Sequence, residues 1–110
     1  MSSSKKVDRA QLHVHATFNN TIITLTDTQG QVLAWKTPGM VGFKGSRKGT
    51  PFAAQRATER LVDQMKDFGI RSVTVLIKGT GSGRNAVVNA LKSASVRIEE
   101  VKNVTPVAYS

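Results

Sequence analysis

Hydrophobic and polar residues alternate along the first third of the chain, which is the pattern of half-buried β-strands. Residues 11–18 alternate with period two, and Asn19 and Asn20 are expected to form a two-residue turn because asparagine tolerates positive φ. The β-branched segment 21–27 indicates the returning strand, and a turn signal precedes a third strand at 31–37. The chain is therefore expected to begin with an antiparallel meander.

The same alternation assigns side chains to the two faces of this meander. With the turn at the two asparagines, Val14, Ala16 and Phe18 share one face with Ile23 and Leu25.

The middle of the chain predicts a long loop followed by an amphipathic helix. Residues 38–49 carry four glycines and no periodic pattern, Thr50 is a good N-cap, and Pro51 suits the first helical position. Gly69 is a natural C-terminal stop. Apolar residues at helical spacing predict the buried stripe: Ala54, Ala57, Leu61, Met65 and Phe68.

The last third predicts a strand, a helix and a strand. A buried-looking strand at 71–78 leads through a tight loop at 79–83 into a short helix at 84–94 and a final strand at 96–104. A unit of this length favours a right-handed parallel crossover. The predicted fold class is thus α/β, with a mixed sheet and the order β-β-β-α-β-α-β.

Composition limits the classes of protein to be considered. The 110 residues suit one domain, expected at 11–110 after a flexible basic segment at 1–10, and 39% hydrophobic residues permit a core. Sixteen Lys and Arg against seven Asp and Glu give a formal charge of +9, which favours a polyanionic partner. The chain has no cysteine, no apolar run near the roughly 20 residues of a membrane span, and no secretory signal pattern.

The charge is also segregated along the chain. No acidic residue occurs between Thr28 and Thr58 or between Phe68 and Ile98, although both stretches contain several cations. This pattern predicts a basic surface that is separate from an ordinary mixed one.

The basic loop before the first helix is the leading candidate site. Lys44, Arg47 and Lys48 lie among glycines that permit close backbone approach, and the following helix N-terminus carries partial positive charge. These features suit a phosphate, either of a small ligand or of a nucleic acid. The alternative is a solvated loop whose cations serve solubility.

The glycine-rich segment 78–86 is the second candidate, because it lies between a strand and a helix as a dinucleotide fingerprint does. Glu99 even lies about 20 residues after Gly79, where a ribose-binding acid is expected. However, the glycine spacing is G-x-G-x-G rather than G-x-G-x-x-G, and the flanking Lys78 and Arg84 favour a polyanion. A merely structural tight turn is the other alternative.

The exposed side of the second helix carries amides and a cation. Asn85, Asn89 and Lys92 are spaced four and three residues apart, which places them on one side, and Ser82 and Arg84 stand at its start. Such a stripe suits sugar, base-edge and phosphate contacts, although an ordinary solvated face has the same pattern.

Catalytic and metal sites are not indicated. The acids of the first helix, Glu59, Asp63 and Asp67, lie beside cations at helical spacing and predict a salt-bridged solvent face. His13 and His15 share a strand face with Thr24 and Thr26, but no third ligand is evident. We expect no enzyme activity, no cofactor and no metal.

Three motifs resemble a known family. "HVHATFNNTIITLTD", "GFKGSRKGTPFAAQ" and "GTGSGR" followed by "VTPV" are similar to the S-eleven family of small-subunit ribosomal proteins, of bacterial or organellar type, over about residues 11–107. The resemblance implies an α/β domain of ribonuclease-H-like shape without catalytic carboxylates. It also implies a structural role on the platform of the small subunit, bridging rRNA helices near the mRNA exit beside S-seven and S-eighteen family proteins.

The resemblance also maps functional positions onto this chain. Asn19 and Asn20 match the family's turn, Lys44–Lys48 its basic loop and Gly79–Arg84 its glycine-rich loop. Together with the acid-free stretches and the amide stripe, this gives the expected rRNA-binding residues: Asn19, Asn20, Lys36, Lys44, Gly45, Ser46, Arg47, Lys48, Arg56, Lys78, Gly79, Gly81, Ser82, Gly83, Arg84, Asn85, Asn89 and Lys92.

The chain departs from the family pattern in three places. The family often carries a longer basic N-terminal tail, for which only Lys5, Lys6 and Arg9 stand here. The family often has prolines where Thr80 and Ser82 stand, and it usually continues beyond "VTP" into a Pro-, Lys- and Arg-rich tail, whereas this sequence ends at "VTPVAYS". Two other hypotheses stay open from the residues alone. One is a small nucleotide-dependent enzyme that uses Gly79–Gly83, and the other is a non-ribosomal, sequence-tolerant nucleic-acid binder.

Overall fold

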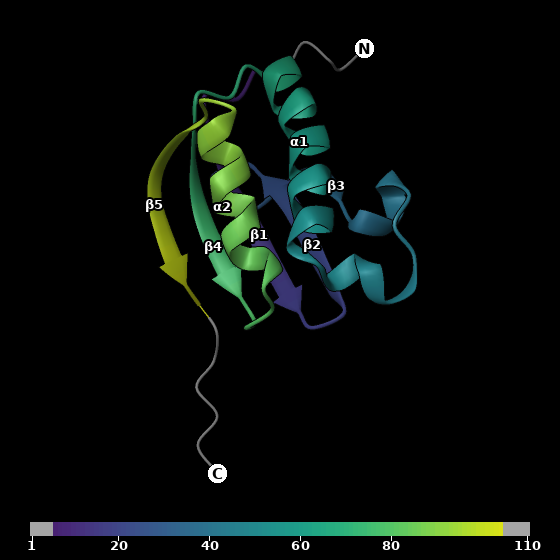
Figure 1. Ribbon diagram of the computed structural model, residues 1–110. Coiled ribbons are helices and arrows are strands. Elements are labelled where there is room, and N and C mark those ends of the chain that lie inside the picture. The colour runs from purple at the N-terminus through teal and green to yellow at the C-terminus, as the bar shows by residue number, and fades with distance from the viewer. Residues whose placement is uncertain (1–5, 105–110) are drawn as a thin grey trace.

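The computed structural model describes residues 6–104 and has the element order expected from the sequence (Figure 1). The apolar alternation and the glycine punctuation thus located every strand and α-helix, with end shifts of one or two residues. The elements are β1 (Arg9–Thr17), β2 (Asn20–Thr26), β3 (Val32–Lys36), α1 (Pro51–Phe68), β4 (Ser72–Lys78), α2 (Gly83–Ser93) and β5 (Arg97–Asn103).

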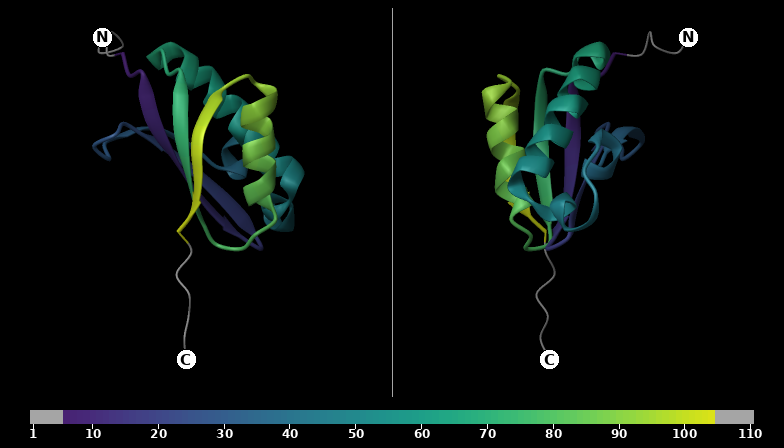
Figure 2. Two further views of the ribbon diagram at one scale, coloured as in Figure 1. Left: turned by 90° about the vertical axis from the view of Figure 1, so that its left-hand side faces the viewer. Right: turned by 45° about the vertical axis from the view of Figure 1, so that its right-hand side comes forward.

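The five strands form one mixed sheet in the order β3-β2-β1-β4-β5. The β1–β2 and β2–β3 pairs are antiparallel, whereas β1–β4 and β4–β5 are parallel. Both helices cover the same face of the sheet, as the turned views show (Figure 2). The mixed α/β fold and the parallel β4–α2–β5 crossover are therefore confirmed.

The core lies between the sheet and the two helices. Val14 of β1 and Ile23 and Leu25 of β2 are buried there on one face of the sheet, as the alternation predicted, together with Leu12. Phe18 was expected on the same strand face, but it lies in the turn and its side chain is 87% exposed.

The reason for this error is the position of the first turn. Phe18 and Asn19 form the turn, and Thr17 pairs with Asn20, so the turn lies one residue earlier than predicted. A turn shift of one residue moves each cross-strand partner by two, and the two faces of the strands are unchanged as a result.

Side-chain hydrogen bonds account for this turn better than tolerance of positive φ. The Thr17 hydroxyl donates to Asn19 Oδ1 at 2.8 Å, and Asn20 Oδ1 accepts from the Thr21 N–H at 2.9 Å. Neither Phe18 nor Asn19 has a positive φ, since Ser95 is the one non-glycine residue with positive φ within residues 6–104. The asparagines therefore serve as local hydrogen-bond acceptors.

Helix α1 begins and ends at the predicted signals. The Thr50 hydroxyl accepts from the Ala53 N–H at 3.2 Å, Pro51 is the first helical residue, and Gly69 ends the helix with φ of 75°. The predicted stripe faces the core, with its last member, Phe68, only half-buried. The expected loop at 38–49 is more regular than predicted, because it contains two short 3-10 turns, η2 (Pro38–Val41) and η3 (Gly45–Gly49).

The described part of the N-terminal segment belongs to the fold. Val7 is buried and its N–H donates to the Phe68 carbonyl at 2.9 Å, and β1 already begins at Arg9. The folded region thus starts before the boundary expected at residue 11. The rest of the predicted flexible segment, residues 1–5, lies outside the described residues, as do residues 105–110. Neither helix within residues 6–104 has the length of apolar sequence that a bilayer crossing requires.

Candidate nucleic-acid interface

Three segments that are distant in sequence meet at one end of the sheet, which we call the loop end. They are the β1–β2 turn, the stretch from Gly42 to Thr50, and the β4–α2 loop from Lys78 to Ser82, together with the first turns of α1 and α2 (Figure 1, lower end). Strand direction explains the meeting. Strands β1 and β4 are parallel, so their C-terminal ends lie at the same end of the sheet. Each helix starts at this end and runs back along the sheet.

Glycines allow the loops to pack directly on the β1–β2 turn. A Cβ atom added at Gly49 would collide with the carbonyl oxygen of Phe18 and would lie 2.8 Å from Asn19 Cα. A Cβ added at Gly81 would lie 2.7 Å from the carbonyl carbon of Thr17. Backbone atoms cannot yield as a flexible side chain can, so these two positions require glycine.

The glycine-rich loop is anchored along its whole length. A Cβ at Gly79 would strike the Ala16 carbonyl oxygen, and one at Gly83 would strike Thr21 Oγ1. The Ser82 hydroxyl also donates to the Gly49 carbonyl at 3.4 Å, which joins the two loops. These contacts make the loop end one packed unit.

The same contacts give these glycines a structural role within the protein. The glycines at 49, 79, 81 and 83 bring the loops against the protein's own hairpin. Gly42 and Gly45 differ, because both have positive φ and an added Cβ at either would meet nothing within 4 Å. These two glycines of the basic loop therefore face open space.

The loop end carries five cations without an acidic partner. Lys44, Arg47 and Lys78 are exposed, and Lys48 and Arg84 are half-buried. No ion pair joins any of the five to a carboxylate of residues 6–104. Lys44 and Arg47 also line a shallow pocket of about 300 Å³. Their charges are thus available to an external anion.

The seven acidic side chains of the sequence all lie outside the loop end. Asp8 pairs with Arg71 at 3.6 Å, and Glu99 lies 3.6 Å from Arg9, both at the opposite end of the sheet. The nearest acid along α1 is Glu59, halfway along the helix. The charge segregation predicted from the sequence is therefore realised in space along the strand direction.

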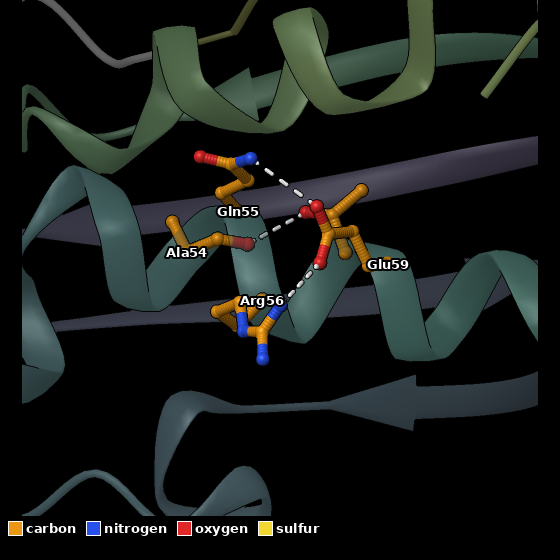
Figure 3. A network of polar contacts seen from close by, with 5 residues as sticks. Ala54, Gln55, Arg56 and Glu59 are labelled. Atoms are coloured by element: carbon orange, nitrogen blue, oxygen red, sulfur yellow. Dashed lines mark hydrogen bonds and ion pairs between the residues drawn. The ribbon is translucent and has the colours of Figure 1, made fainter. Parts of the chain in front are cut away.

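Four of the predicted site residues lie outside the loop end, and one of them is Asn89 in the second turn of α2. Lys36 ends the edge strand β3 opposite Ile23, and Lys92 is in the last turn of α2. Arg56 is on α1, and its guanidinium pairs with Glu59 at 3.3 Å, as Figure 3 shows. The remaining predicted residues are brought together by the fold.

The comparison with known proteins agrees with this geometry. A family model described as ribosomal protein S11 matches residues 10–110, which is nearly the whole chain. The chain belongs to the ribosomal protein S11 family. Membership confirms the resemblance of the motifs and implies a structural protein of the small ribosomal subunit that binds rRNA and neighbouring ribosomal proteins.

The S11 family is structural rather than catalytic. The geometry around the glycine-rich loop, the one segment whose sequence resembled a dinucleotide-binding motif, agrees with this. A dinucleotide site needs its ribose-binding acid beside the glycine loop, at the carboxyl end of the next strand. Glu99 instead lies near the start of β5 and accepts from the Ser72 hydroxyl at 3.1 Å. It therefore sits at the opposite end of β4 from the glycine loop.

The two histidines have an ordinary environment on the open face of the sheet. His13 Nε2 lies 3.3 Å from Thr26 Oγ1, diagonally across the strand pair. Within residues 6–104, no group of three His, Cys, Asp or Glu side chains is placed to hold a metal ion.

Sequence reasoning missed one aromatic residue beside the amide stripe of α2. Phe52 is 58% exposed, and with Gln55 of α1 it faces Ser82, Asn85 and Asn89 across a cleft. Its position two residues after the N-cap, outside the buried stripe, was a signal available in the sequence.

Proposed function

We propose that the loop end is the rRNA-binding surface of this S11 family protein. The observation that carries the proposal is the gathering of five unpaired cations at the end of the sheet where both helices begin, with every acidic side chain elsewhere. A surface of this kind suits the sugar–phosphate backbone, which dominates affinity in protein–RNA complexes.

The mechanism is electrostatic and geometric. Lys44, Arg47 and Lys48 neutralise phosphates on one side of the loop end, and Lys78 and Arg84 do so on the other. The helix N-termini add partial positive charge at the same place. The Gly49, Gly81 and Ser82 contacts hold together the two loops from which the five cations project.

The position in the subunit is the finer part of the proposal. We place the protein on the platform, near the mRNA exit, where it bridges separate rRNA helices beside S-seven and S-eighteen family proteins. The support is the resemblance of its motifs to the bacterial and organellar branch of the family. On this proposal the protein works in a bacterial cytoplasm or in an organelle.

A charge-reversal pair tests the loop end. Arg47→Glu with Lys48→Glu should weaken binding to in vitro transcribed small-subunit rRNA and reduce the slope of log K against log salt by roughly 1.4–1.8, at about 0.7–0.9 per lost phosphate contact. Arg60→Glu with Lys66→Glu makes the same charge change on exposed positions of α1 away from the loop end. Equal losses in affinity and slope for the two pairs would show that net charge, not the loop end, controls binding.

A second experiment tests the position in the subunit. The tagged protein should sediment with the small subunit at moderate salt, and cross-links from the assembled subunit should reach the S-seven and S-eighteen proteins. Cross-links confined to proteins of another region would refute the platform placement while leaving the rRNA-binding surface intact.

A further inference from the structure

A cleft of about 480 Å³ separates the first turns of α1 and α2 beside the loop end. Phe52 and Gln55 line it from α1, and Ser82, Asn85 and Asn89 line it from the α2 side. None of its lining residues is charged. The volume falls in the range of roughly 300–1,000 Å³ that is typical of sites for small organic groups.

The aromatic wall of this cleft is held in place although it is exposed. The Phe52 ring packs edge-to-face on Phe43, with centroids 5.8 Å apart and an interplanar angle of 80°. The Arg56 guanidinium lies 5.7 Å from the centroid of the same ring. These neighbours restrict the ring before any ligand arrives. A flat partner that enters the cleft therefore causes little further loss of conformational entropy in the Phe52 side chain.

The opposite wall carries unused amide groups. Asn85 and Asn89 lie one helical turn apart and are exposed, and neither side chain is hydrogen-bonded to another group of residues 6–104. Gln55 projects from α1 on the side of α2, and its Nε2 donates to Glu59 at 3.2 Å (Figure 3). Amides both donate and accept, so they can pair with the polar edge of a nucleobase.

We propose that this cleft receives one unstacked rRNA base, with its plane against Phe52 and its polar edge against Asn85 and Asn89. The proposal rests on the function proposed above and adds a base-reading site to a phosphate-binding surface. The neutral lining suits a neutral base, and the flanking cations suit its phosphates. Both cations lie close in sequence to residues at the cleft. Arg84 is two residues after Ser82, which lines the cleft. Lys48 comes directly before Gly49, whose carbonyl accepts a hydrogen bond from the Ser82 hydroxyl.

This arrangement divides two tasks between neighbouring groups. The cations position the RNA without regard to sequence, whereas the aromatic ring and amides contact a base directly. The loop end alone would bind any suitably shaped backbone. The cleft would add a preference for a site where one base is splayed out of its stack.

Removal of the flat ring tests the proposal. Phe52→Leu keeps an apolar contact for Phe43 but lacks a stacking surface, and it should weaken binding to in vitro transcribed small-subunit rRNA by roughly 5- to 150-fold. Because a stacked base releases no counterions, the slope of log K against log salt should stay unchanged. Trp35→Leu removes a comparably exposed aromatic from β3, outside the cleft, and serves as the matched control.

A second variant guards against a folding effect at the start of α1. Asn85→Ala with Asn89→Ala changes only exposed positions and favours the helix, and it should also weaken binding without changing the salt slope. Wild-type affinity in both cleft variants would overturn the base-reading site. An equal loss in Trp35→Leu would overturn its assignment to this cleft.

The same assay separates this proposal from the function on which it rests. If Arg47→Glu with Lys48→Glu lowers the slope while the cleft variants bind normally, the phosphate surface stands and the cleft does not read a base. If the charge-reversal pair also behaves as its control does, the rRNA-binding role of the loop end fails as well.

Fluorescence gives a direct readout of stacking. Trp35 is the single tryptophan of the chain, so Phe52→Trp in a Trp35→Phe background places the only indole in the cleft. Its emission should be quenched when small-subunit rRNA is added, whereas that of wild-type Trp35 should change far less. An unquenched Trp at position 52 under saturating rRNA would overturn the proposal.

Discussion

Gly49 is the position where a single added methyl group should reveal how the loop end is built. Its Cα faces the β1–β2 turn so closely that a Cβ would collide with the Phe18 carbonyl oxygen and lie 2.8 Å from Asn19 Cα. Gly39 provides a matched control, because neither glycine has positive φ and the nearest atom to a Cβ at Gly39 is 3.8 Å away. The two alanine variants therefore differ mainly in the space that is available to the added methyl group.

The expected magnitudes follow from this difference. Overpacking against backbone atoms that cannot rotate away destabilises the folded state by about 1–3 kcal/mol. At either site, alanine also lowers the conformational entropy of the unfolded chain, which stabilises the protein by about 0.4–1 kcal/mol. Gly49→Ala should thus lower the free energy of unfolding by about 1–2 kcal/mol. Gly39→Ala should leave it unchanged or raise it slightly.

Thermal and denaturant unfolding of the three proteins measure these changes. A loss of 2 kcal/mol corresponds to a fall in Tm of roughly 8 °C for a domain of this size. Gly49→Ala should also weaken rRNA binding, because the basic loop separates from the hairpin. Equal Tm values for Gly49→Ala and Gly39→Ala would refute the argument that close packing on the turn requires glycine at position 49.

Three further substitutions test local features of the fold by equilibrium unfolding. Thr50→Ala removes the hydroxyl that accepts from the Ala53 N–H and should cost about 1 kcal/mol, so an unchanged midpoint would exclude a capping role. Leu61→Ala empties a fully buried position of α1 and should cost about 2–5 kcal/mol, and a loss below 1 kcal/mol would mean that the helix does not pack as described. Asn20→Ala removes the acceptor for the Thr21 N–H and should cost roughly 0.5–1.5 kcal/mol, whereas no loss would show that water replaces this bond.

Much of the fold was predictable because its signals are local. The cap at Thr50, the stop at Gly69 and the period-two alternation of β1 act within a few residues of chain, and each was located correctly. The turn at Phe18 and Asn19 was missed by one residue. Its position depends on side-chain hydrogen bonds and on the loops that pack against it, which no local pattern displays.

The candidate site was predictable in its residue types but not in its construction. Sequence alone marked the basic loop, the glycine-rich loop and the amide stripe as separate features. The sequence could not distinguish a glycine that faces solvent, such as Gly45, from one that faces the hairpin, such as Gly81. The residue type is the same, and only the surroundings differ. The salt-bridged face that the sequence predicted on α1 is present at Arg56, which pairs with Glu59 although it was also among the expected rRNA-binding residues.

By itself the sequence determined the α/β element order, the buried faces, the excess positive charge and the family motifs, since these depend on local chemistry and on residue identity. Only the tertiary structure decided that three remote segments share one end of the sheet and that Phe52 faces the α2 amides across a cleft. The physical reason is that proximity between remote segments is set by strand direction and by the packing of helices on the sheet.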